Sequence, residues 1–155
     1  MLSLTKRSEY ALVAMCHLAR VKPRVTSARE IAELHEVPLP LLMNVLKQLS
    51  QAGMVRSVRG AKGGYTLAGP PESLALSAVI SAVEGPVALV DCAPGARRRR
   101  RGCNRAAVCS IRRPVHKVHR QLVKFLDGLS IADIAFDEDY ADRSAAAGRR
   151  KGRPS

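Results

Sequence analysis

The stretch SAREIAELHEVPLPLLMNVLKQLSQAG, residues 27–53, predicts two short helices joined by a tight connection. Ser27 precedes Glu30 by three residues, a spacing typical of a capping box at the start of a helix. Ile31 and Leu34 are the expected buried side of this first helix. Two short helices joined by a few residues are typical of a helix-turn-helix unit.

The second helix of the pair carries an apolar stripe at helical spacing, formed by Leu42, Val45, Leu46 and Leu49. Pro38 and Pro40 are compatible only with its first turn, because proline lacks the N–H that later turns require. Gly53 is the expected end of the helix.

Two short strand-like runs follow, MVRSVRG at 54–60 and GGYTLAG at 63–69. The segment Gly60–Gly63 between them supplies the glycines of a tight turn. A hairpin with a basic tip directly after a helix-turn-helix predicts the wing of a winged helix.

The composition supports a mainly helical fold. The chain has 155 residues, of which 46% are hydrophobic and only 3% aromatic, so its core must be aliphatic. An aliphatic core favours packed helices over aromatic-rich strands. We therefore expect a mainly α fold with a small β-hairpin wing, a winged helix-turn-helix followed by a long dimerisation helix.

The net charge of +13 favours a polyanionic partner, with nucleic acid ahead of an anionic membrane surface. The N-terminal residues contain neither a signal peptide nor an apolar run long enough to span a bilayer. The four cysteines do not resemble a secreted disulfide scaffold. These features predict a cytoplasmic protein with reduced thiols and no membrane partner.

Three further helices are expected outside the helix-turn-helix unit, at 4–21, 74–85 and 113–129. The last has one apolar side with nothing obvious left in the chain to cover it, which suggests a homodimer interface; this side comprises Val115, Val118, Leu122, Phe125, Leu126 and Leu129. SIADIAF at 130–136 is expected to cap its end.

The predicted organisation has four parts. These are a DNA-binding domain at 1–85, a cysteine-containing loop at 86–112, the dimerisation helix with a terminal short helix at 113–136, and a disordered basic tail at 137–155. The tail is expected to be a solvated segment, with nucleic-acid backbone contact as the alternative.

Candidate DNA contacts lie on the predicted second helix and the wing, because a winged helix places these elements against the duplex. Arg59 is the most specific of them, since the adjacent Gly60 permits close approach to DNA. A single surface cation is usually just solvated, so the clustering of these residues is stronger evidence for a DNA contact than any one of them. The set is Arg29, Asn44, Lys47, Gln48, Arg56, Arg59 and Lys62.

Cysteines and arginines are concentrated in CAPGARRRRRGCNRAAVC, residues 92–109, where Cys92, Cys103 and Cys109 flank the run Arg97–Arg101. The spacing is not that of a ferredoxin. Cys16, by contrast, lies among apolar helix positions and is expected to be a small core residue.

The order of these motifs closely resembles the bacterial Rrf2 family of winged-helix regulators, which includes IscR and NsrR. The resemblance spans 2–136 and rests on LTKRSEYALVAM, SAREIAE, VRGAKGGYTL, AVISAVEGP, the three cysteines and FLDGLSIADI. It implies a homodimer and, in many members, an iron–sulfur cluster that sets DNA affinity. The chain departs from the family where Pro38, Pro40 and Leu41 replace small polar residues, which shifts the expected base contacts to the wing and later turns.

The resemblance also implies a ligand set for the cluster. Family members usually have five residues in both gaps between the cysteines, and the arginine run matches the excess in the first gap here. The position of the IscR-type histidine is Arg112, which cannot ligate iron. The NsrR-type carboxylate, supplied by the partner subunit, aligns with Glu9. A third type uses a histidine at the position of Val13, which excludes that set. The implied ligands are therefore Cys92, Cys103, Cys109 and the partner's Glu9, with a [4Fe–4S] cluster favoured over [2Fe–2S].

Other interpretations of the cysteines remain open. Three thiolates with His116 or His119 are a possible zinc site, although these histidines are more simply expected to decorate the long helix. The thiols could also form a redox disulfide without metal. The arginine run could lower thiol pKa values, offset cluster charge, contact phosphate, or be a solvated insertion.

The sequence thus predicts a DNA-binding transcriptional regulator, a repressor, whose operator affinity is controlled by an iron–sulfur cluster that senses nitric oxide, redox state or iron. The alternative is a cluster-free or zinc-stabilised nucleic-acid-binding protein, including a thiol redox switch. No catalytic residues are expected: no nucleophile–base pair stands out, and GAKGG lacks the full phosphate-loop pattern.

Overall fold

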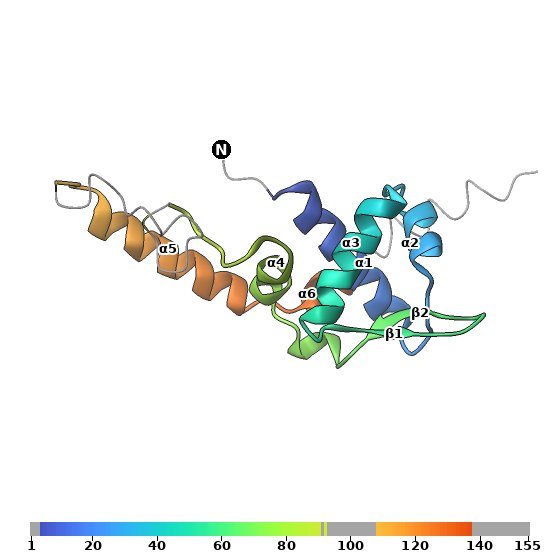
Figure 1. Ribbon diagram of the computed structural model, residues 1–155. Coiled ribbons are helices and arrows are strands. Elements are labelled where there is room, and N and C mark those ends of the chain that lie inside the picture. Colours follow the sequence, from blue (N-terminus) through green and yellow to red (C-terminus); the bar gives the residue numbers. More distant parts are fainter. Residues whose placement is uncertain (1–3, 91, 93–107, 138–155) are drawn as a thin grey trace, which may run out of the picture.

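The structure is a computed structural model that describes residues 4–90, 92 and 108–137. A body of helices with a hairpin on one side carries one long helix, α5, that projects away from it (Figure 1). The elements are α1 (Lys6–Val21), α2 (Ala28–Leu34), α3 (Leu39–Gln51), β1 (Val55–Val58), β2 (Gly64–Leu67), the 3-10 turn η1 (Pro71–Ser73), α4 (Leu76–Glu84), α5 (Arg112–Asp127) and α6 (Ile131–Ala135).

Helices α2 and α3 form the predicted helix-turn-helix. The Ser27 hydroxyl accepts a hydrogen bond from the Glu30 N–H at 3.1 Å, which is one half of the predicted capping box. The Glu30 carboxylate instead forms an ion pair with Arg24 at 2.5 Å. Ile31 is fully buried, but the prediction for Leu34 was wrong, because its side chain is 59% exposed. Leu34 is the last residue of α2 and points to solvent, and Ala32 lies in the core in its place.

Helix α3 agrees with its sequence pattern. All four side chains of the predicted stripe are buried, and this stripe packs α3 against α1. Pro38 is the N-cap and Pro40 lies in the first turn. Gly53 adopts a φ of 74° just after the end of the helix, a conformation that glycine tolerates without strain.

Strands β1 and β2 form the predicted antiparallel hairpin, with Val55 opposite Leu67 and both side chains buried. The hairpin also pairs with the segment before α2: the N–H groups of Thr26 and Tyr65 donate to each other's carbonyls at 3.0 and 2.8 Å. A Cβ on Gly64 would overlap the Thr26 carbonyl, so glycine is required for this approach. The position of the wing is therefore fixed against the start of the helix-turn-helix.

Helix α1 lies at the centre of the body and packs against α3, α4 and α6. Its N-cap Thr5 accepts a hydrogen bond from the Ser8 N–H at 3.2 Å. Cys16 is buried in the core, as predicted, and burial raises the pKa of its thiol.

The segment SIADIAF does more than cap a helix. It forms α6, which begins with a full capping box between Ser130 and Asp133 and returns to the body. Ile131 is fully buried in the same core as α1, and Arg20 Nε donates to the Ala135 carbonyl at 2.7 Å. The residues after the long helix thus help to hold the base of α5 to the body.

Among the described elements, helix α5 packs mainly against α4, and Asp127 at its end accepts a hydrogen bond from the Ser77 hydroxyl. Along its apolar side, Val118 is 52% exposed and Phe125 is 63% exposed. Among the described residues, no helix combines the length and apolar character needed to cross a bilayer.

Candidate nucleic-acid interface and metal centre

Helix α3 and the hairpin place most of the predicted DNA contacts in solvent. On α3, Asn44 and Lys47 are exposed, and Asn44 lies three residues before Lys47 and four before Gln48, so it is next to both on the helix surface. Arg29 is exposed in the first turn of α2. Each of these side chains is therefore accessible to a polyanion.

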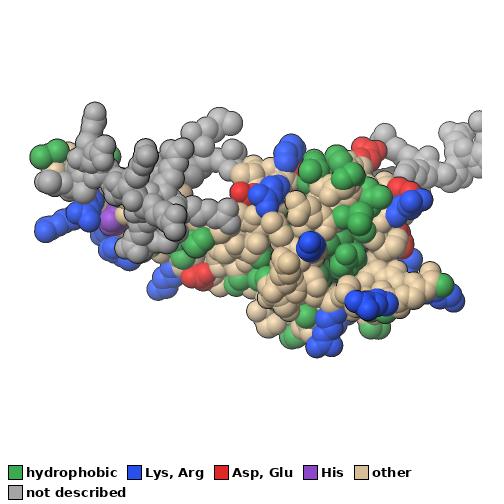
Figure 2. All heavy atoms as spheres, viewed as in Figure 1, with side chains coloured by type: hydrophobic (Ala, Val, Ile, Leu, Met, Phe, Trp, Pro, Cys, Tyr) green, Lys and Arg blue, Asp and Glu red, His purple; other side chains and the backbone are tan. Residues whose placement is uncertain are grey.

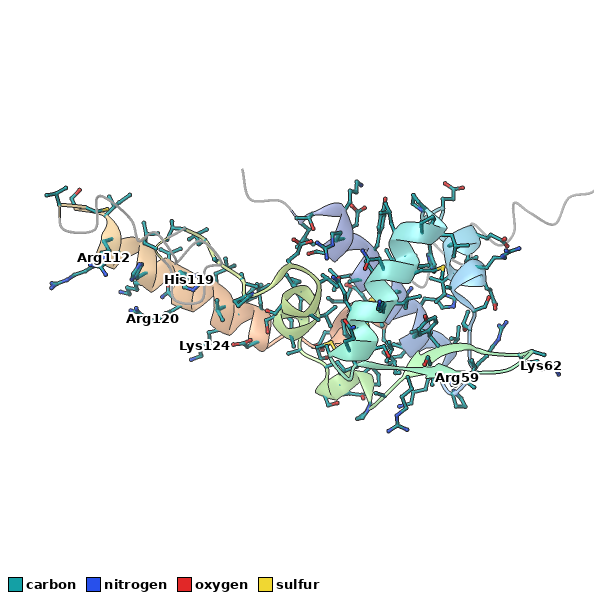
Figure 3. The ribbon with its side chains drawn as sticks, viewed as in Figure 1. Arg59, Lys62, Arg112, His119, Arg120 and Lys124 are labelled. Atoms are coloured by element: carbon teal, nitrogen blue, oxygen red, sulfur yellow. The ribbon has the colours of Figure 1, made fainter. Side chains whose placement is uncertain are left out.

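The hairpin is a cationic projection. Arg56, Arg59 and Lys62 are all exposed, and residues 54–69 contain no acidic side chain. Arg59 and Lys62 lie toward the far end of the hairpin (Figure 3), next to Gly60 with its φ of 121°. In the space-filling view, lysine and arginine side chains gather at the hairpin and along the projecting α5 (Figure 2). The hairpin tip is thus suited to contact phosphate.

Gln48 differs from its neighbours on α3 because it is only half exposed and already has a partner. Arg7 Nη2 on α1 donates a hydrogen bond to Gln48 Oε1 at 2.9 Å. Arg7 and Gln48 lie 41 positions apart, so no local pattern in the sequence indicates this contact. It was not predicted.

The cysteine segment is described at its two ends. Cys92 and Cys109 are free thiols, half-buried, whereas Cys103 and the run Arg97–Arg101 lie outside the described residues. The Cys92 Sγ atom lies 3.4 Å from Nε2 of His116 on α5. A thiol and an imidazole therefore meet at the first end of the segment, beside α5.

The expectation that both histidines merely decorate α5 was wrong. His116 is half-buried against Cys92, and His119 is only 5% exposed. The Nδ1 atom of His119 accepts a hydrogen bond from the Leu89 N–H at 3.4 Å. The segment that leads to Cys92 runs back along α5. It covers a side of the helix that the spacing of apolar residues does not predict to be buried.

Glu9 lies in the first turn of α1 with its side chain 49% exposed. Its carboxylate accepts a hydrogen bond from Lys6 Nζ at 2.8 Å, and this bond raises the pKa of Lys6. The Glu9 carboxylate is thus half exposed and paired with the exposed Lys6 within the protomer.

The donor chemistry of this region fits a thiophilic metal centre. Thiolates and imidazole are the ligands that iron–sulfur clusters and zinc prefer. Within the part of the chain that the structure describes, no three His, Cys, Asp or Glu side chains form a group that could hold a metal ion by themselves.

The predicted basic tail at 137–155, apart from Asp137, lies outside the described residues.

Three comparisons bear on the identity of the chain. Residues 4–137 match the family model Rrf2, described as an iron-dependent transcriptional regulator. The chain is 31% identical over 136 residues to an rrf2-like HTH-type transcriptional regulator of Rhodobacter capsulatus, with 84% of this chain and 91% of that protein covered.

Solved structures are similar in fold. IscR of T. potens superposes with a TM-score of 0.68 and 28% identity, covering 90% of each chain. CymR, the global cysteine regulator of B. subtilis, superposes with a TM-score of 0.66 and 26% identity, covering 87% of this chain and 97% of that one.

Proposed function

The chain belongs to the Rrf2 family of transcriptional regulators, and we propose that it is a cytoplasmic, homodimeric repressor whose affinity for an operator is set by an iron–sulfur cluster. Membership of this family makes it an HTH regulator and not an enzyme. The family is described as iron-dependent, and the observation that carries the proposal is a pair of accessible thiols, Cys92 and Cys109, at the two ends of one segment beside α5.

The DNA-binding part of the proposal rests on α3 and the hairpin. The exposed Asn44 amide and the Lys47 ammonium of α3 face the major groove, while Arg59 and Lys62 contact phosphates beside it. Two copies of this surface, joined through the exposed apolar side of α5, would read two half-sites one helical turn or its multiples apart.

The proposed cluster ligands are Cys92, Cys103 and Cys109 of one subunit and the partner's Glu9. A bound cluster would supply a centre that nitric oxide, oxidants or iron shortage can alter. The thiolates hold the two ends of the segment near α5, and the carboxylate is the weaker, exchangeable ligand. Glu9 is also on α1, which packs against α3, so a change at Glu9 reaches the DNA-binding unit through that helix. We propose [4Fe–4S], with [2Fe–2S] as the alternative.

One observation favours a second candidate, a structural zinc site. The 3.4 Å contact between Cys92 Sγ and His116 Nε2 is compatible with two ligands of one tetrahedral ion. In that case the protein is a zinc-stabilised winged-helix regulator in which the metal holds the segment to α5 and senses nothing.

Anaerobic purification followed by absorbance spectroscopy and iron, sulfide and zinc assays separates the two candidates. Iron and acid-labile sulfide with visible absorbance are expected for the sensor, and their absence after attempted anaerobic assembly contradicts it. Colourless protein with stoichiometric zinc is expected for the second candidate. Replacing Glu9 by Ala should change the spectrum or oxygen stability of the assembled centre, whereas replacing His116 by Ala should leave both unchanged if the first candidate is correct.

The DNA-binding claim is tested separately by titrating the full chain against a duplex at several salt concentrations. The logarithm of the binding constant should fall by about 0.9 per phosphate neutralised for each tenfold rise in salt. A flat response to salt would remove the DNA-binding part of the proposal.

A further inference from the structure

Three elements that are distant in sequence meet at the carboxylate of Glu84. The Thr5 hydroxyl at the start of α1 donates a hydrogen bond to Glu84 Oε1 at 2.7 Å. Arg7 Nε lies 3.9 Å from the same oxygen and forms an ion pair with it. Glu84 is the last residue of α4 and holds one edge of the Arg7 guanidinium in place.

The other edge of Arg7 reaches the recognition helix α3, where Nη2 donates to Gln48 Oε1 at 2.9 Å. A guanidinium presents donors in a planar fork, so one side chain can serve the carboxylate and the amide together. The side chain of Arg7 is 42% exposed and that of Glu84 is 28% exposed, so water only partly competes for these contacts.

The contact with Arg7 decides which way the Gln48 amide faces. Arginine can only donate hydrogen bonds, so the atom of the amide that meets Arg7 must be the carbonyl oxygen. The NH₂ group of Gln48 is then the part directed away from Arg7. Gln48 shares its helix face with the exposed Asn44, which places that NH₂ group beside the surface proposed to meet DNA.

We propose that Arg7 is a positioning residue that determines base preference, because it turns the Gln48 oxygen toward α1 and so presents the Gln48 NH₂ group to DNA. A free glutamine reads adenine with two hydrogen bonds, one accepted by its oxygen and one donated by its nitrogen. With its oxygen turned toward Arg7, Gln48 can only donate to DNA. It then accepts any base with an acceptor in reach, such as a purine N7, the O6 of guanine or the O4 of thymine, and no longer singles out adenine. This inference rests on the proposed DNA-binding function.

The test selects duplexes from a random-sequence library with the full-length parent and with the variants Arg7→Met, Gln48→Met and the double variant. At one base position of each half-site, Arg7→Met should raise the preference for adenine over the other bases by about fivefold, because the freed amide can both donate to adenine and accept from it. Gln48→Met should abolish preference at the same position, and the double variant should match Gln48→Met, because Arg7 acts through Gln48.

Lys6→Met is the matched control, since it removes one positive charge from the same turn of α1. In the described part of the chain, the Lys6 ammonium bonds to Glu9 and not to Gln48. It should keep the parent's base preference. Glu84→Gln keeps an acceptor for Thr5 but loses the charge that holds Arg7, so it should shift the preference in the same direction and by less. Thermal unfolding checks that each variant folds. Arg7→Lys replaces Arg7→Met if that variant does not fold, and it should shift the preference toward adenine by less.

Two outcomes overturn the inference alone. One is an unchanged preference in Arg7→Met in a protein that binds DNA with the expected salt dependence. The other is additive loss in the double variant. If the parent binds no duplex at any salt concentration, the proposed function fails, and this inference fails with it.

Discussion

The Nδ1 atom of His17 lies 3.1 Å from Nε2 of His35, and the two rings meet edge to face. His17 is on α1 and His35 caps the end of α2, so this pair joins the central helix to the turn of the helix-turn-helix. Burial is the main cause that lowers the pKa values of both histidines. The charge of His35 lowers the pKa of His17 further, and the charge of Arg20 lowers both pKa values. Arg24 lowers the pKa of His17 further, and Glu30 opposes the shift.

The pair predicts acid sensitivity of the fold. Because the folded pKa values lie below the ordinary value of 6.5, the unfolded chain binds more protons as pH falls. The free energy of unfolding should thus be nearly constant above about pH 7 and decrease as pH falls below about 6.5. Urea unfolding across this range measures it.

His35→Asn removes one of the two titrating groups and should reduce that decrease to about half. Asn44→Ala on α3, which replaces no titratable group and lies at an exposed position, is the control and should keep the parent's pH dependence. An equal slope for the parent and His35→Asn would mean that the pair is not the source of the acid sensitivity.

Gly64→Ala should destabilise the wing. A Cβ at this position overlaps the backbone of Thr26, so β2 must move and the paired hydrogen bonds between Thr26 and Tyr65 are lost. We expect a loss of about 2–4 kcal/mol in the free energy of unfolding. Gly69→Ala is the matched control, because a Cβ there meets only the Ser73 hydroxyl at 3.6 Å. Equal stability of the two variants in urea unfolding would contradict this account.

Arg59→Ala should weaken DNA binding by the full chain and reduce the magnitude of the salt slope by about 1, as expected for the loss of one phosphate contact. Fluorescence anisotropy at several salt concentrations gives both quantities. Lys124→Ala removes a charge from α5, away from the hairpin (Figure 3), and should change the slope less. If both variants lose affinity equally, the effect is one of overall charge and Arg59 is no contact.

Phe125→Asp should convert the proposed homodimer into a monomer, because it buries a charge within the apolar side of α5. Sedimentation equilibrium measures the association state. Arg120→Asp alters the charge on the opposite side of the same helix and should leave the dimer intact. A dimer that persists in Phe125→Asp with unchanged affinity would place the interface elsewhere.

Local sequence patterns were sufficient for the elements of the fold. The stripe of α3, the glycines of the hairpin and the ends of α4 and α5 were predictable to within a few residues, because helix periodicity, caps and turns depend on near neighbours. Leu34 shows the limit of this reasoning. Its spacing from Ile31 suits a buried face, but α2 ends there and the side chain points to solvent.

The candidate site was less accessible to sequence reasoning. The basic hairpin and the cysteines are visible as composition, but the burial of His119 and the contact of His116 with Cys92 depend on a segment that returns along α5. The return of α6 to α1 and the pairing of Thr26 with Tyr65 likewise join segments that are remote in sequence.

By itself, the sequence determined the helix-turn-helix, the wing and the apolar side of the long helix, since each follows from spacing and residue type within one short segment. Only the tertiary structure decided which polar groups meet, as Arg7 and Gln48 do, because such contacts form when packing brings distant segments together and the direction of a hydrogen bond depends on the groups that face each other.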